Sequence, residues 1–156
     1  SDLEREQLWA NWDEVLATNL TGAFQISMAV APFLKRSGGR IVNIGSIAAY
    51  TGGRSQGSAI YAASKAGLNG LTVGLAREFS GGGVTVNGIA PGLVGGTEFT
   101  AAWDPARIED YVKDVPAGRP GRADEIAATV AFLCSADAGY ITGQVIHQNG
   151  GAYFAP

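Results

Sequence analysis

The sequence predicts an α/β fold in which a parallel sheet of about three strands is covered by helices on both faces. Three helical patterns alternate with three short apolar runs along the 156 residues. Strands and helices that alternate at this spacing are joined by right-handed crossovers, which make neighbouring strands parallel. Hydrophobic residues make up 46% of the chain and charged residues 16%, which suits elements buried on several sides. Residues 1–156 are therefore expected to form a single domain with its own core.

The first predicted helix ends around residues 32–37. Ser1 and Glu4 match a capping box, and apolar residues recur behind them at steps of three and four. The polar residue Asn19 falls within this apolar stripe. A pair of glycines then breaks the helical pattern, so the helix is expected to give way to a turn.

Residues 40–44 form a short run rich in β-branched residues, which predicts a buried strand with Ser46 directly behind its end. A glycine-rich loop leads to a second helix over residues 58–80, whose apolar side chains share one face. Another face of this helix is small and consists of Ala63, Gly67, Gly70 and Gly74. Glycine inside a helix costs about 1 kcal/mol relative to alanine, so this face suggests close approach by another backbone. Either a partner subunit or another part of the same molecule would fit.

The C-terminal half of the chain repeats the alternation. Residues 84–90 predict a second strand, which Pro91 and a following glycine close. Residues 98–115 have a weak helical pattern and are expected to be mobile. A further helix over residues 123–135 leads to a third strand over residues 143–147. We expect the three strands to lie side by side in chain order, with the first two helices on one face of the sheet.

The composition argues against several classes of partner and site. A net charge of -3 and a pI near 5.0 provide no basic surface for nucleic acid or an anionic membrane. No run of 18 apolar residues suggests a transmembrane helix. Cys134 is the only cysteine and lies in an apolar stretch, so we expect a core cysteine in a reduced cytoplasmic setting. His147 is the only histidine, and no metal site is expected.

Tyr61 and Lys65 are the first candidates for catalysis. They lie four residues apart on a predicted helix, so both side chains emerge on one face. Free tyrosine has a pKa of about 10, and a nearby ammonium favours its ionised form, as general acid or base catalysis requires. Such a pair also arises by chance. Considered separately, Ser46 is equally typical of a turn residue after a strand. Asn19 is equally typical of a polar helix residue whose side chain is hydrogen-bonded to the backbone.

The joint pattern is more specific. Its motifs, in chain order, are Thr18-Asn19-Leu20-Thr21-Gly22, Ser46, Tyr61-Ala62-Ala63-Ser64-Lys65, Asn87-Gly88-Ile89-Ala90-Pro91-Gly92, Tyr140-Ile141-Thr142-Gly143-Gln144 and Asn149-Gly150-Gly151. With them, essentially the whole chain resembles the C-terminal, catalytic part of a short-chain dehydrogenase/reductase, of the kind that includes 3-oxoacyl-carrier-protein reductases. The resemblance implies a partial Rossmann-like fold, the C-terminal portion of an NAD(P)-binding oxidoreductase, without the N-terminal nucleotide-binding half.

The resemblance also implies a role for each candidate. Tyr61 would donate or accept the proton, and Lys65 would hold the nicotinamide ribose and favour ionised Tyr61. Ser46 would bind the substrate oxygen, and Asn19 would position a water that relays protons. The residues implied to contact NAD or NADP are Tyr61, Lys65, Pro91, Gly92, Val94 and Thr97. Residues 98–115 would form a mobile lid over the substrate.

A loop beside this implied site carries Arg54 and Gln56. Loop side chains of this kind usually point into solvent. Because the loop lies beside the implied site, contact of these two side chains with a substrate is the alternative. Both interpretations stay open.

Two functions remain open from the sequence. The first is hydride transfer between a nicotinamide cofactor and a carbonyl or secondary alcohol, resembling that of 3-oxoacyl-carrier-protein reductases, in a homo-oligomer formed through the long helices. The second is a truncated, non-catalytic module that acts in oligomerisation or partner binding. The second is favoured by one observation, because no glycine-rich phosphate-binding turn precedes the catalytic motifs. The 156 residues alone are expected to be inactive or weakly active.

Overall fold

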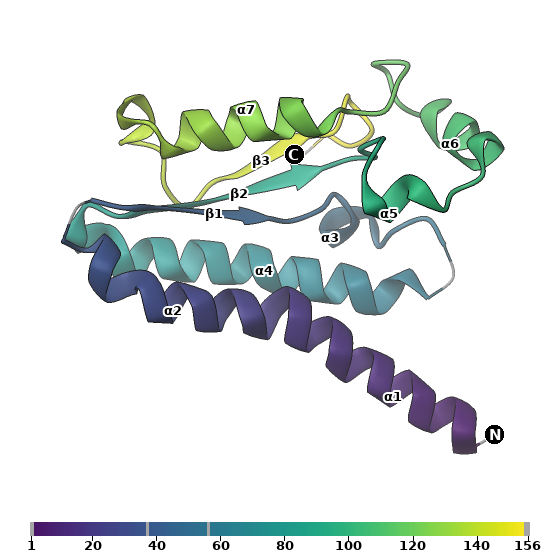
Figure 1. Ribbon diagram of the computed structural model, residues 1–156, viewed down its shortest axis with the longest axis horizontal. Helices are drawn as coiled ribbons and strands as arrows, with labels where there is room; N and C mark the ends of the chain where they lie inside the picture. Colours follow the sequence, from purple (N-terminus) through teal and green to yellow (C-terminus); the bar gives the residue numbers. More distant parts are fainter. Residues whose placement is uncertain (1, 37, 56, 155–156) are drawn as a thin grey trace.

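A three-stranded parallel sheet forms the middle layer of the computed structural model, which describes residues 2–36, 38–55 and 57–154 (Figure 1). The strands are β1 (Arg40–Ile44), β2 (Thr85–Pro91) and β3 (Val145–Gln148), and they lie in the order β1-β2-β3. Both pairs are parallel. The predicted order and direction of the strands are confirmed. The residues Ser1 and Gln56, named above as a helix cap and a loop contact, lie outside the described residues.

Helices cover both faces of the sheet, as predicted. Figure 1 shows α2 (Gly22–Leu34) and α4 (Ser58–Phe79) running beneath the sheet and α7 (Ala123–Cys134) above it. β2 is buried along its whole length because it has a strand on each side and helices on each face. The polar residues Thr85 and Asn87 are buried there together with the apolar ones. The edge strand β1 is only half-buried, which corrects the prediction of a buried strand over residues 40–44.

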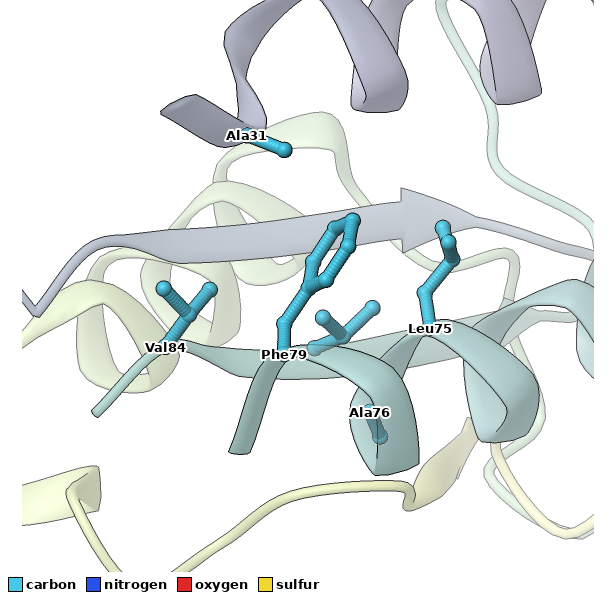
Figure 2. Packing of buried hydrophobic residues seen from close by; sticks show 6 residues of the cluster. Ala31, Leu75, Ala76, Phe79 and Val84 are labelled. Atoms are coloured by element: carbon cyan, nitrogen blue, oxygen red, sulfur yellow. The ribbon is translucent and has the colours of Figure 1, made fainter. Parts of the chain in front are cut away.

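The core consists of two clusters, one on each side of β2. The first lies between the sheet, α4 and α2, and Figure 2 shows its side chains converging from these elements. Its buried members are Ala31, Leu75, Ala76, Phe79, Val84 and Val86. The second joins Ile89, Leu133 and Ala138 on the side of α7. Val86 and Ile89 are an odd number of residues apart, so they point to opposite faces of the strand and anchor one cluster each.

The first helix is not continuous. It consists of α1 (Asp2–Leu16), a five-residue π-helical segment η1 (Ala17–Thr21) and α2. The backbone N–H of Gly22 donates to the carbonyl of Ala17, five residues earlier, which is the spacing of a π-turn. The inserted residue shifts the helical register at Asn19, and α1 extends away from the sheet (Figure 1).

The apolar stripe predicted on this first helix is largely exposed within the chain. Its exposed members, together with neighbouring exposed apolar residues, are Leu8, Trp9, Trp12, Phe24, Ile26, Met28, Val30 and Phe33. Contiguous apolar surface of this kind usually marks an interaction site. The periodicity thus identified the helix correctly, but its apolar face does not pack into this chain's own core.

The segment predicted as weakly helical folds as two short helices, α5 (Glu98–Ala101) and α6 (Pro105–Val112). A single turn, α3 (Ala48–Thr51), follows β1. The 3-10 turns η2 (Ser80–Gly82) and η3 (Ala136–Ala138) follow α4 and α7.

The expectation of a core cysteine is wrong. Cys134 is exposed, whereas Leu133 beside it is completely buried. Successive residues of a helix point about 100° apart, so only one of these neighbours can face the sheet.

None of the described helices is long and apolar enough to cross a membrane. Among the described residues, no three His, Cys, Asp or Glu side chains gather in a group that could hold a metal ion.

The different burial of the neighbours Leu133 and Cys134 gives a test of the core. Replacing Leu133→Ala should lower the free energy of unfolding by about 2–5 kcal/mol, because the substitution leaves a cavity beneath α7. Replacing Cys134→Ala on the exposed side should change it by less than about 0.5 kcal/mol. Urea denaturation of both variants measures the difference. Equal losses would contradict the placement of α7.

His147 gives a second test, at the end of β3. Its ring centroid lies 4.5 Å from that of Tyr50 and 5.3 Å from that of Tyr153, and its buried Nδ1 has no partner among the described residues. Burial lowers the pKa of His147, so the unfolded chain binds more protons between the folded and unfolded pKa values. Stability should therefore decline as the pH falls through about 6.5.

The matched variant is His147→Phe, which keeps a ring between the two tyrosines but cannot titrate. Because His147 is the only histidine, the wild-type protein should lose unfolding free energy between about pH 7.5 and 5.5 while the variant stays level. Parallel curves for the two proteins would show that this ring does not carry the pH dependence.

Candidate active site

A cavity of about 1020 Å³ opens beyond the carboxyl ends of β1 and β2. Open parallel sheets bind ligands at this edge, because the loops that follow the strands diverge there. Most of the residues singled out from the sequence line this cavity, namely Ser46, Tyr61, Lys65, Pro91, Gly92, Val94 and Thr97. The structure thus brings together residues that are separated by up to about fifty positions in the chain.

Tyr61 and Lys65 stand on the first turns of α4, on the side that faces the cavity. The Lys65 ammonium lies 5.7 Å from the centroid of the Tyr61 ring, and its Nζ donates to the carbonyl of Ile44 at 2.9 Å. Burial lowers the pKa of Lys65 below its ordinary value. The end of β1 therefore fixes the position of the amine, and the amine places positive charge beside the phenol ring.

Ser46 is held by the turn that follows β1. Its Oγ accepts a hydrogen bond from the N–H of Ala48 at 3.1 Å, and the hydroxyl proton has no acceptor among the described residues. The neighbouring N–H groups of Gly45 and Ile47 donate to the carbonyls of β2 residues, which ties this turn to the sheet. Ser46 can therefore donate a hydrogen bond to an oxygen placed in the cavity.

Asn19 does not line the cavity. Its Nδ2 donates to Oγ of Ser64 at 3.0 Å, and that hydroxyl donates to the carbonyl of Tyr61 at 2.7 Å. Ser64 belongs to α4 and is completely buried where this helix contacts η1. The chain of two hydrogen bonds connects the π-turn to the backbone of Tyr61, so Asn19 contacts the site through Ser64.

Ser64 was missed in the sequence reasoning. A signal existed, because Ser64 lies between Tyr61 and Lys65 in the motif and three residues after Tyr61, where its hydroxyl can reach back to a helix carbonyl.

The outer wall of the cavity is aromatic and was also missed. Ring centroids follow one another from Tyr61 to Phe99 at 6.3 Å, from Phe99 to Trp103 at 5.6 Å and from Trp103 to Tyr111 at 6.3 Å. The available signal was the spacing, since Phe99, Trp103, Arg107 and Tyr111 recur every four residues and all line the cavity.

Arginines contact two of these rings. The guanidinium of Arg54 lies 4.6 Å from the centroid of Tyr111 and pairs with Asp114, and that of Arg107 lies 3.9 Å from the centroid of Trp103. Burial raises the pKa of Tyr111, which keeps this phenol protonated. The Arg54 loop is therefore attached to the segment that carries α6.

Thr97 and Gly92 border the inner part of the cavity. The Thr97 hydroxyl lies 3.3 Å from the carbonyl of Val94 and shares a capping box with Thr100 at the start of α5. A side chain at Gly92 would meet Asn149 at 3.0 Å, so the backbone must approach the end of β3 closely. The inner cavity thus has a polar side formed by Ser46, Tyr61 and Lys65 and a largely apolar side formed by Pro91, Gly92 and Val94.

Comparison with known proteins agrees with this geometry. The family model described as Enoyl-(Acyl carrier protein) reductase matches residues 4–153. The 3-oxoacyl-(acyl-carrier-protein) reductases FabG of Vibrio cholerae and Escherichia coli are each 46% identical over 143 residues, which is 91% of this chain. FabG of Aquifex aeolicus is 43% identical over 144 residues. The chain spans 57% of the length of each of these relatives. The chain belongs to the short-chain dehydrogenase/reductase family of oxidoreductases.

Proposed function

We propose that this chain carries the catalytic part of an NAD(P)-dependent oxidoreductase that interconverts a carbonyl and a secondary alcohol. The observation that carries the proposal is the convergence of Ser46, Tyr61 and Lys65 on one cavity at the carboxyl end of the sheet. The names of the relatives support a reaction like that of a 3-oxoacyl-(acyl-carrier-protein) reductase. In this proposal residues 1–156 form one domain, the C-terminal portion of a Rossmann-fold enzyme.

The inner cavity fits the nicotinamide end of NAD or NADP. A planar ring suits the largely apolar side, and the Lys65 amine is the donor that can reach a ribose hydroxyl. The proposed contacts are Tyr61, Lys65, Pro91, Gly92, Val94 and Thr97. The cofactor, when bound, supplies the hydride.

The chain's own residues would handle the proton and the oxygen. Ser46 donates a hydrogen bond to the carbonyl oxygen, and the Tyr61 hydroxyl gives its proton to that oxygen as it becomes an alcohol. The Lys65 ammonium beside the ring stabilises the phenolate that remains. In the reverse direction Tyr61 accepts the proton. Asn19 is proposed to act through Ser64, which fixes the backbone of α4 at Tyr61.

Residues 98–115 are proposed to form the lid of the cavity. Both α5 and α6 belong to this segment, and five of its residues line the cavity, namely Phe99, Trp103, Arg107, Asp110 and Tyr111. Closure of such a segment would exclude water from the reacting oxygen.

A second copy of the chain is proposed to cover the exposed apolar surface of α1 and α2. The small face of α4 supports this proposal in part. A side chain at Gly67 would come within 2.9 Å of Leu20 of the same chain, whereas side chains at Gly70 and Gly74 would meet nothing within 4 Å. The part of this face at Gly70 and Gly74 is therefore open, and α1 and α2 also expose apolar side chains. Both features suit a homo-oligomer.

The second candidate function is a non-catalytic module for oligomerisation or partner binding. It is favoured by the same exposed apolar surface. The two candidates differ in whether Tyr61 performs chemistry.

Replacing Tyr61→Phe in the full-length protein should lower turnover at least about 100-fold, because the proton donor is lost while the ring remains. The matched control is Tyr140→Phe, since the Tyr140 ring is fully exposed. Turnover is measured as nicotinamide absorbance with a ketone substrate. Equal turnover in both variants would show that another group moves the proton.

The 156 residues on their own should bind reduced nicotinamide cofactor weakly and associate with one another. Pyrophosphate contacts, which provide much of the binding energy of a dinucleotide, require the glycine turn that they lack. Fluorescence titration with NADH and NADPH and sedimentation analysis measure both properties. A stable monomer with micromolar affinity would refute this expectation.

A further inference from the structure

We propose that the outer part of the cavity selects a flat, apolar carbonyl or alcohol substrate that carries an anionic group, and that Arg107 binds this group. The inference rests on the proposed function and names the substrate class for the same site. Its basis is the aromatic wall of Phe99, Trp103 and Tyr111 together with the charge distribution at the outer end of the cavity.

The aromatic wall begins beside the reacting group. The planes of Tyr61 and Phe99 lie within 23° of one another, and Trp103 and Tyr111 extend the series outwards. Phe99 is 66% exposed even though it lines a cavity. An aromatic ring left open towards a cavity offers its face to a ligand, and offset stacking favours a planar partner. A flat substrate can therefore continue the series with its carbonyl near Tyr61.

Arg107 is positioned to receive an anion. Its guanidinium stacks on Trp103 at 3.9 Å, which limits the orientations of the planar group. No carboxylate lies within ion-pair distance of Arg107 in the part of the chain that the structure describes. The free edge of a guanidinium matches the two oxygens of a carboxylate, so a carboxylate is the anion that this group recognises best.

The other charges of the outer wall are already paired. Arg54 is paired with Asp114, and Asp110 lies 3.3 Å from the amine of Lys113. Arg107 therefore provides the unpaired positive charge at this end, while the Lys65 amine lies beside Tyr61 at the inner end. This arrangement would orient a substrate with its carbonyl inwards and its carboxylate outwards.

The test compares two ligands of the same shape, para-acetylbenzoate and its neutral amide, by calorimetric titration of the full-length protein. The wild-type protein should bind the carboxylate about three- to tenfold more tightly, which is the scale of one partly exposed charge-assisted contact. Arg107→Gln should abolish this preference. Arg77→Gln, which removes one positive charge from the exposed side of α4 outside the cavity, should retain it.

A third ligand, an aliphatic oxo acid of the same length, tests the aromatic wall. Wild-type protein should prefer para-acetylbenzoate to it, and Phe99→Leu should reduce that preference. The proposal is overturned if the carboxylate and the amide bind wild-type protein equally, or if Arg107→Gln keeps the preference. Binding is measured without turnover, so loss of the preference can be distinguished from failure of Tyr61 to act as the proton donor.

Discussion

The attachment of the β1 end to the β2 end is the constraint on which the rest of the site depends. The N–H of Gly45 donates to the carbonyl of Ile89 at 2.7 Å, and the N–H of Ile47 donates to that of Pro91 at 3.0 Å. A side chain at Gly45 would come within 3.0 Å of the Ile89 oxygen, so this close approach requires glycine. The two hydrogen bonds extend the parallel ladder beyond β1. They leave Ser46 between them at the edge of the sheet where ligands bind.

Polar contacts between α4 and its neighbours then fix the proposed catalytic pair, Tyr61 and Lys65. Lys65 is bonded to the last carbonyl of β1, and further along the helix Thr72 accepts a hydrogen bond from Asn43 of the same strand at 2.9 Å. On the other side of α4, Ser64 connects Asn19 to the Tyr61 backbone. Buried polar groups require partners, and here the partners lie on different elements. The same contacts that satisfy these groups therefore determine where Tyr61 and Lys65 stand.

The sheet was predictable because its strands are short, largely apolar runs between glycine-rich breaks. The inner cavity was predictable because its residues come from the ends of strands and from the first turns of one helix. Sequence reasoning missed the π-turn at Asn19, since an inserted residue leaves the helical periodicity of each flanking segment intact. It placed Cys134 in the core because an apolar run does not reveal which neighbour faces inwards. The pairing of Arg54 with Asp114 joins residues 60 positions apart, so no local pattern could predict it. Contacts between side chains were thus least predictable where loops, rather than strands, bring the residues together.

Isotope transfer is the most direct test of the central claim, that this cavity serves exchange of hydride and proton at a carbonyl. The full-length protein would be given a ketone and nicotinamide cofactor deuterated at the transferring carbon, and the alcohol product would be analysed by mass spectrometry and NMR. Hydride transfer in this cavity predicts deuterium on the carbinol carbon of the alcohol. An alcohol without deuterium at carbon, or no alcohol at all, would contradict it.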